Sequence, residues 1–219
     1  MNDVVYEIKK EKIRKTLNDD LNNIMEINIE YPELHSPENN KSVAQINRFY
    51  SGISASFFKY CEKKFRKFKQ SNDSGEKTKS AEIMKYFVPL KNESYLSVVY
   101  EITHYDGCFS ETHRIAQTWN IKQGLILPVT YFLKSNGLNV RKIKKEVGDI
   151  IMQGIKESES DFSYTLKSIK RYAYRVDPEN YFLCEKGIAF WFDKGTLAPD
   201  TEGFPAFVIP ITNKKELSD

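Results

Sequence analysis

The sequence predicts an α+β fold, in which a mainly antiparallel sheet packs against one long helix and a second, shorter helix. Three observations support this class. Apolar and polar side chains alternate along several segments, which is typical of strands with one buried face. From Ser42 to about Gln70 the apolar spacing changes to three or four residues, which predicts a long amphipathic helix. The chain is also rich in Phe and Tyr, with 14 and 13 residues, and such side chains favour sheets.

Two strands are expected before the long helix, over residues 3–15 and 21–31, where the side chains alternate. Pro32 and Pro37 are expected to end the second strand, because proline lacks an amide donor and restricts the residue before it. Ser42 is then the expected N-cap of the helix. The apolar face of that helix comprises Val43, Ile46, Tyr50, Ile53, Phe57, Tyr60 and Phe68.

The other face of the long helix carries cations near its end, at Lys63, Lys64, Arg66, Lys67 and Lys69. This face could bind an acidic or nucleic-acid partner. It is explained as well by a solvated helix end, where cations interact favourably with the helix dipole. A net charge of +3 is too small to favour nucleic acid, so nucleic acid is not an expected partner.

The remainder of the chain is predicted to hold six more strands and the second helix. The strands are expected over 83–90, 95–104, 113–121, 181–183, 188–192 and 204–211. Apolar spacing predicts the second helix over about 140–156, and residues 161–174 could form a short third one. The apolar segment 125–133 contains Pro128, and no element is predicted for it. All 219 residues are expected to form a single domain.

The cysteines and the first residues bear on location. Cys61, Cys108 and Cys184 are odd in number and widely spaced, so free thiols in a reducing compartment are expected. The first 30 residues hold no apolar run typical of a signal peptide, and no stretch is long enough to span a membrane. The expected location is the cytoplasm, with an extracytoplasmic one as the alternative if an export signal has been removed.

Reactive side chains are densest around the loop 106–111. The group comprises His104, Asp106, Cys108, Glu111 and His113. If the flanking strands pair as a hairpin, both histidines should lie on its core-facing side. Such residue types can bind zinc, and Cys108 with a histidine is the one candidate nucleophile–base pair. The spacing matches no metal motif, however, and hydrogen-bonded histidines at the end of a sheet explain it equally well.

No catalytic class is indicated elsewhere. The sequence contains no phosphate-binding glycine loop and no nucleophile elbow. Trp119 and Trp191 could stack on sugars but lie in strand patterns, so they are expected in the core. We therefore assign no catalytic residue, no metal ligand and no cofactor.

Several short motifs occur in a fixed order along the chain. The longest is Asn180-Tyr181-Phe182-Leu183-Cys184-Glu185-Lys186-Gly187-Ile188-Ala189-Phe190-Trp191-Phe192, followed by Leu197-Ala198-Pro199, Gly203-Phe204-Pro205 and Val208-Ile209-Pro210. Earlier ones are Tyr31-Pro32-Glu33-Leu34, Ile46-Asn47 and Trp119-Asn120-Ile121 with Gly124, Leu127 and Tyr131-Phe132. Over roughly residues 25–212 the chain resembles a bacterial family of domains of unknown function. That family forms the C-terminal domain of the peptidoglycan deacetylase PdaC and the extracytoplasmic domain of the anti-sigma factor RsiV.

The resemblance implies a non-enzymatic, sensor-like domain that binds a ligand or a protein and is related to bacterial cell-envelope sensing. In the deacetylase the catalytic machinery belongs to a separate domain, and in the anti-sigma factor this domain binds lysozyme. The alternative is an enzyme, or an enzyme accessory, that acts on cell-wall glycan. The expected partner is thus an unidentified protein or a cell-wall glycan.

One loop departs from the family pattern. The family often has a Gly-Ala-His-Gly type loop after its second central strand, whereas this chain has Asp106-Gly107-Cys108-Phe109-Ser110. A loop that two strands hold at both ends can vary and carry binding without disturbing the core. The candidate binding residues are Tyr105, Asp106, Gly107, Cys108, Phe109, Ser110, Glu111 and His113.

Overall fold

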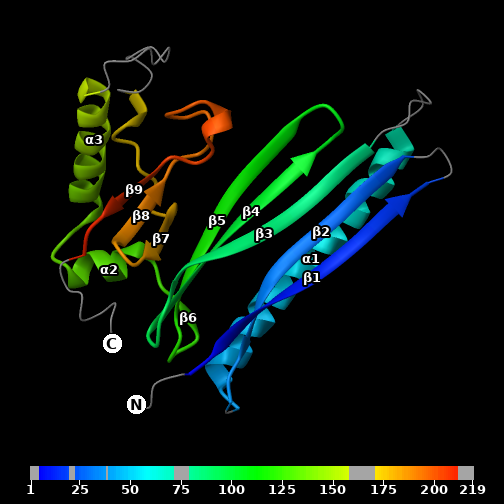
Figure 1. The fold of residues 1–219 in the computed structure, drawn as a ribbon, viewed down its shortest axis with the longest axis horizontal. Coiled ribbons are helices and arrows are strands. Elements are labelled where there is room, and N and C mark those ends of the chain that lie inside the picture. Colours follow the sequence, from blue (N-terminus) through cyan, green and yellow to red (C-terminus); the bar gives the residue numbers. More distant parts are fainter. Residues whose placement is uncertain (1–4, 20–22, 38, 72–78, 158–170, 212–219) are drawn as a thin grey trace. The chain divides into compact units, whose positions relative to one another are not determined.

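The computed structural model describes residues 5–19, 23–37, 39–71, 79–157 and 171–211, with side chains omitted at 68–71 and 155–157. It confirms the α+β class (Figure 1). The first sheet has the order β1 (Glu7–Asn18), β2 (Ile24–His35), β3 (Lys79–Lys91), β4 (Tyr95–Tyr105), β5 (Ser110–Asn120) and β6 (Leu125–Ile126). The second has the order β7 (Tyr181–Cys184), β8 (Gly187–Trp191) and β9 (Ala206–Ile209). The helices are α1 (Lys41–Ser71), α2 (Val129–Ser135), α3 (Val140–Glu157) and the 3-10 turn η1 (Asp200–Glu202).

The first sheet contains one parallel pair. β1 and β2 are antiparallel, whereas β2 runs parallel to β3 from Ile24 opposite Lys79 to Ile29 opposite Met84. Parallel neighbours need a long crossover, and α1 supplies it between β2 and β3. The long helix is therefore part of the sheet's connectivity as well as its cover.

The chain divides into two compact units. The first comprises residues 1–87, 99–115 and 121–124, and the second comprises 88–98, 116–120 and 125–219. β3, β4 and β5 each have one end in either unit. Of the described helices, α1 belongs to the first unit, and α2, α3 and η1 belong to the second.

In the first unit, α1 lies along β2 (Figure 1). Its buried side chains, among those described, are Val43, Ile46, Tyr50, Ser54, Cys61 and Phe65. Tyr50 meets Tyr100 of β4, with ring centroids 5.8 Å apart. The expected face is confirmed at its start, Ile53 and Phe57 are half-buried at its margin, and the prediction is wrong for Tyr60, which is exposed. Beyond Tyr50 the side chains that face the sheet are those four, eleven and fifteen residues later, which follows the 3.6-residue turn.

The N-cap of α1 is Asn40, not Ser42. The Asn40 Oδ1 atom accepts hydrogen bonds from the backbone N–H groups of Ser42 and Val43, at 2.9 and 3.2 Å. The Ser42 hydroxyl instead donates to the carbonyl oxygen of Lys122, at 3.0 Å. At the adjacent Gly124, where φ is +67°, a Cβ atom would lie 3.0 Å from the Ser42 Cα. The start of α1 is thus closely packed against the turn after β5.

β2 continues through Pro32, contrary to the sequence-based expectation. Pro32 lies opposite Lys10 of β1, and the strand ends only at His35. Alternate residues of a strand direct their backbone N–H and C=O groups to the same side, so the backbone groups of Pro32 face the same side as those of Leu34. The backbone N–H and C=O groups of Leu34 face the Asn47 side chain of α1 and not β1. The missing amide of Pro32 therefore removes no hydrogen bond with β1, and the strand tolerates it.

In the second unit, β8 lies between β7 and β9 and carries Phe190 and Trp191, each 1 % exposed. The predicted strand pair around the turn at 185–186 is confirmed, and so is the burial of Trp119 and Trp191. The segment with Pro128 forms the unpredicted helix α2, which begins directly after the proline. Most of the candidate third helix, 161–174, lies outside the described residues. No described helix is long and apolar enough to cross a membrane.

Candidate functional site

The candidate loop forms a compact turn between β4 and β5. The Asp106 carboxylate accepts hydrogen bonds from the backbone N–H groups of Cys108 and Phe109, at 2.9 and 2.8 Å. The Asp106 N–H donates to the carbonyl oxygen of Phe109, at 3.2 Å, and the Tyr105 hydroxyl donates to that of Gly107, at 2.6 Å. Gly107 has φ of +105°, a region that side chains with a Cβ rarely adopt. One carboxylate and one glycine therefore hold the turn.

The turn presents its side chains to solvent. Phe109 is 78 % exposed, the largest value among the exposed large hydrophobic side chains of the described residues. Tyr105 is 36 % exposed, and Cys108, Ser110 and Glu111 are exposed as well. The aromatic ring of Phe109 thus stands free on a turn whose backbone is well hydrogen-bonded.

Backbone hydrogen bonds keep Asp106 ionised. The N–H of Phe109 and then that of Cys108 lower the pKa of its carboxyl below the ordinary value. The carboxylate that orders the turn is therefore charged throughout the neutral and mildly acidic range.

The two histidines beside the loop have different surroundings. His113 is exposed, with its Nε2 atom 3.2 Å from Glu111 Oε1. The expectation that both histidines face the core is wrong for His113, whose side chain is 66 % exposed. The helix α1 lies along β2, and β5 is the third strand from β2 in the sheet. The helix therefore does not cover His113 on β5. Among the described residues, no three His, Cys, Asp or Glu side chains are placed to hold a metal ion.

His104 belongs to a cluster that the sequence did not predict. Its Nδ1 atom lies 2.7 Å from Oε1 of Glu82 on β3, and the Lys64 Nζ atom of α1 lies 3.0 Å from the same oxygen. Glu82 is 1 % exposed, and burial raises the pKa of its carboxyl although Lys64 acts in the opposite direction. The available signal was a carboxylate at a core position of β3, between the buried Ser80 and Met84.

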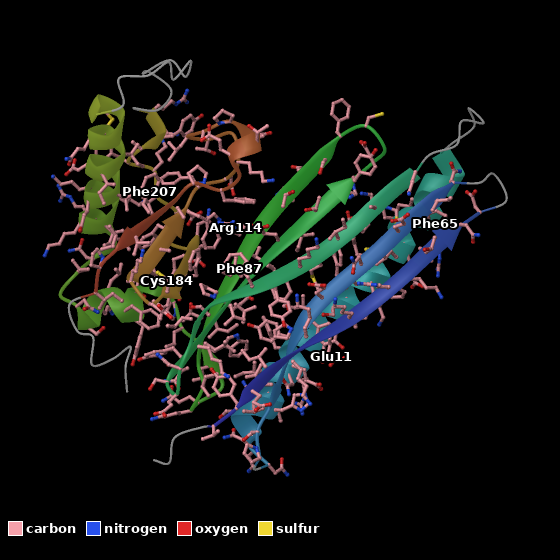
Figure 2. All side chains as sticks on the ribbon, in the orientation of Figure 1. Glu11, Phe65, Phe87, Arg114, Cys184 and Phe207 are labelled. Atoms are coloured by element: carbon pink, nitrogen blue, oxygen red, sulfur yellow. The ribbon has the colours of Figure 1, made fainter. Side chains whose placement is uncertain are left out.

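Below the loop, three strands are tied together on one sheet face. Figure 2 shows Phe87 and Arg114, from β3 and β5, close to each other. The Arg114 guanidinium lies 5.7 Å from the centre of the Phe87 ring, and its Nε donates to Glu101 of β4 at 3.2 Å. The hairpin that carries the loop is thus braced by a cation–π contact and an ion pair.

The second unit contains a separate concave site of about 310 Å³. Its lining includes Gln117, Thr118, Leu127, Pro128, Glu179 and Tyr181. The Tyr181 hydroxyl donates to the carbonyl oxygen of Leu127 and helps to shape it. None of the residues predicted from the sequence as binding residues lines this site.

Two solved structures resemble the chain along nearly its whole length. One is a member of the DUF3298 family from Bacteroides fragilis, at 13 % identity and a TM-score of 0.59, covering 99 % of this chain and 95 % of that one. The other is a DUF3298 family protein from Pseudomonas aeruginosa, at 11 % identity and a TM-score of 0.64, covering 99 % and 96 %. This chain has the fold of these bacterial proteins. At such identities the likeness concerns the fold alone.

Sequence comparison adds nothing to this. No family model matches the chain, and no curated protein matches it either. The fold is therefore that of a bacterial domain of unknown function, and the activity has to be argued from the residues themselves.

Proposed function

We propose that residues 1–219 act as a single, non-enzymatic binding domain, sensor-like and related to bacterial cell-envelope sensing. The loop between β4 and β5 carries the contact with the partner, a protein or a cell-wall glycan. The observation that carries the proposal is the exposed Phe109 ring on a turn ordered by Asp106.

Exposed aromatic side chains are frequent centres of binding energy, because they bury a large apolar area when a partner covers them. Binding also costs the entropy of ordering the contact residues. Here the Asp106 carboxylate and the Tyr105 hydroxyl already order the turn in the free protein. The loop therefore combines an apolar anchor with a low ordering cost.

Polar groups surround this anchor. Glu111 and His113 lie two residues apart on β5 and are both exposed, with Glu111 Oε1 3.2 Å from His113 Nε2. An apolar centre with a polar rim is the usual arrangement of a protein interface. Together with the resemblance to a family whose member binds lysozyme, this arrangement favours a protein partner over a small ligand.

The test compares the wild type with two alanine variants. Val5 is the matched control, because it is 67 % exposed and precedes β1 at its Glu7 end. The loop belongs to the opposite end of the first unit. Tyr105, which precedes the loop, affects the charge of Lys79 at the start of β3, and Lys79 lies opposite Ile24 of β2. Ile24 in turn lies opposite Asn18, the last residue of β1. The two positions are thus comparable in exposure and distant in space.

All three proteins are immobilised and exposed to native lysate, to lysozyme and to muropeptides, and the affinity of each captured partner is measured. Phe109→Ala should weaken binding at least tenfold, since a central aromatic contributes about 2 kcal/mol or more. Val5→Ala should bind like the wild type. A partner that binds all three proteins equally well would place the contact elsewhere and refute the proposal.

A further inference from the structure

Three side chains from three elements meet around one buried oxygen in the first unit. Lys64 Nζ of α1 and His104 Nδ1 of β4 both approach Glu82 Oε1 of β3, at 3.0 and 2.7 Å. Lys64 Nζ also lies against the imidazole ring, 2.8 Å from Nδ1 and in contact with Nε2. Glu82 is buried, whereas the side chains of Lys64 and His104 are 30 % and 29 % exposed.

The ammonium of Lys64, 2.8 Å from His104 Nδ1, favours a neutral imidazole in this arrangement. An ammonium group has donors and no acceptor, so Lys64 can donate only to a ring nitrogen that carries no proton. Nδ1, which lies 2.7 Å from Glu82 Oε1, is the ring nitrogen placed to carry the proton of a neutral ring. A doubly protonated ring would place a second positive charge and a second donor against the ammonium, which is unfavourable at this distance.

The charge balance shows which group would leave. Glu82 and Lys64 neutralise each other when His104 is neutral. A proton on His104 adds one positive charge, and the buried carboxylate then needs only one of the two cations. Glu82 cannot reach water, whereas Lys64 is partly exposed on a long, flexible side chain.

The other titratable groups around the cluster do not change this balance. Cys61 of α1 is buried, and burial, followed by the charge of Glu82, raises the pKa of its thiol to about 12. Asp106 in the loop is close enough to be affected by the charge of Lys64. Glu111 of β5 is near the hairpin end but pairs with His113. The proton balance of the cluster thus depends on Glu82 and His104.

We propose that His104 is a pH-operated switch that exchanges the partner of Glu82. Neutral His104 leaves Glu82 paired with Lys64 and so ties α1 to β3, beside the β4 residue that precedes the loop. Protonated His104 takes over the carboxylate, Lys64 turns to solvent, and the tie is released. Imidazole is the side chain whose charge changes most readily on mild acidification, so a fall in pH drives the exchange. The switch goes beyond the proposed function, because it does not depend on what the loop binds.

The chain has only three histidines, so each imidazole can be followed by NMR between pH 8 and 4.5. At pH 8, His104 should be a single neutral tautomer. On acidification, the backbone signals of residues 61–67 should change with the midpoint of His104. His35 and His113, which pair with Glu33 and Glu111, serve as internal references.

Lys64→Met isolates the exchange. Without the lysine, His104 is the one cation among the described residues that remains within ion-pair distance of the buried Glu82 carboxylate, so the midpoint of His104 should rise by about one pH unit or more, a tenfold change in proton affinity. Lys64→Gln repeats the test if the methionine variant does not fold. Lys63→Met, at the exposed neighbouring lysine, should leave the midpoint of His104 unchanged.

Two results would overturn the switch. One is a His104 midpoint that is the same in the wild type and in the Lys64 variants. The other is an acid-induced change in residues 61–67 with a midpoint that His104 does not share, because the proton would then bind elsewhere, as on Glu82.

Discussion

The side chain of Asn47 completes the end of β2 by pairing with both backbone groups of Leu34. The Leu34 N–H donates to Asn47 Oδ1, and Asn47 Nδ2 donates to the Leu34 carbonyl oxygen, both at 2.8 Å. The amide acts as a short piece of neighbouring strand beyond Ile29, where the pairing with β3 ends. Leu34 ends the motif 31–34 and Asn47 ends the motif 46–47. Two motifs that are separate in the sequence are therefore in direct contact in the fold.

Asn47→Ala should destabilise the protein by about 2–4 kcal/mol, because it leaves a backbone donor and acceptor at the largely buried Leu34 without partners. Urea unfolding measures this. Gln45→Ala is the control, since Gln45 is exposed on the same helix and should change stability by less than about 0.5 kcal/mol. Equal unfolding midpoints for the two variants would show that the amide pair contributes no stability.

Asp106→Ala should loosen the turn without unfolding the domain. The amides of Cys108 and Phe109 lose their acceptor and should exchange faster, while the melting temperature stays nearly the same. Glu111→Gln, beside the turn, should leave their exchange unchanged. The contribution of a carboxylate with a lowered pKa is present above its unfolded value and is lost as pH falls through its folded value. The difference from the wild type should therefore disappear in strong acid.

The three thiols are free and should react at different rates. Cys108 is exposed and should react first, Cys184 more slowly, and Cys61 only upon unfolding, because burial raises its pKa to about 12. A thiol reagent with mass mapping of the native and unfolded protein measures the order. Modification of Cys61 in the native protein at the rate of Cys108 would contradict the packing of α1.

Phe190→Ala should cost about 3–5 kcal/mol, because it removes a ring that is 1 % exposed from the central strand of the second sheet. Leu125→Ala, in the same unit, is the control, since Leu125 is 51 % exposed. Chemical unfolding of both variants measures the difference. A loss below 1 kcal/mol for Phe190→Ala would show that this core is loosely packed.

Glu30→Gln tests the ion pairs that link β1 to β2. Lys10 and Lys12 lie 3.0 and 3.2 Å from the Glu30 carboxylate, and the hydrogen bond from Lys10 is the main cause of its lowered pKa. The variant should lose about 0.5–2 kcal/mol at pH 7, since each partly exposed pair contributes about 0.2–1 kcal/mol. This stability is present above pH 4.5, the ordinary pKa of the carboxyl, and is lost as the pH falls through the lowered pKa of Glu30 in the folded protein. Unfolding curves of the two proteins should therefore converge well below pH 4.5.

Periodicity alone was sufficient to predict most of the elements. The long helix, the helix from Val140 and the β7–β8 pair follow from repeats of apolar side chains, which depend on local geometry. The errors occurred at prolines, because the effect of a proline depends on where the fold directs its backbone groups. Pro32 stays in its strand because its backbone side faces away from β1, and α2 forms directly after Pro128.

The candidate site divides in the same way. The loop 106–109 could be predicted because its position depends on two adjacent strands and its shape on Asp106 and Gly107. The cluster of Lys64, Glu82 and His104 could not, since it depends on how the parallel β2–β3 pair places α1 over β3 and β4. The alternation of side chains and the hydrogen bonds of a turn depend on neighbouring residues. The sequence by itself therefore determined the strands, the long helix and the loop 106–109. Contacts between distant residues depend on which faces pack together, and only the tertiary structure decided that Lys64 and His104 share one buried carboxylate.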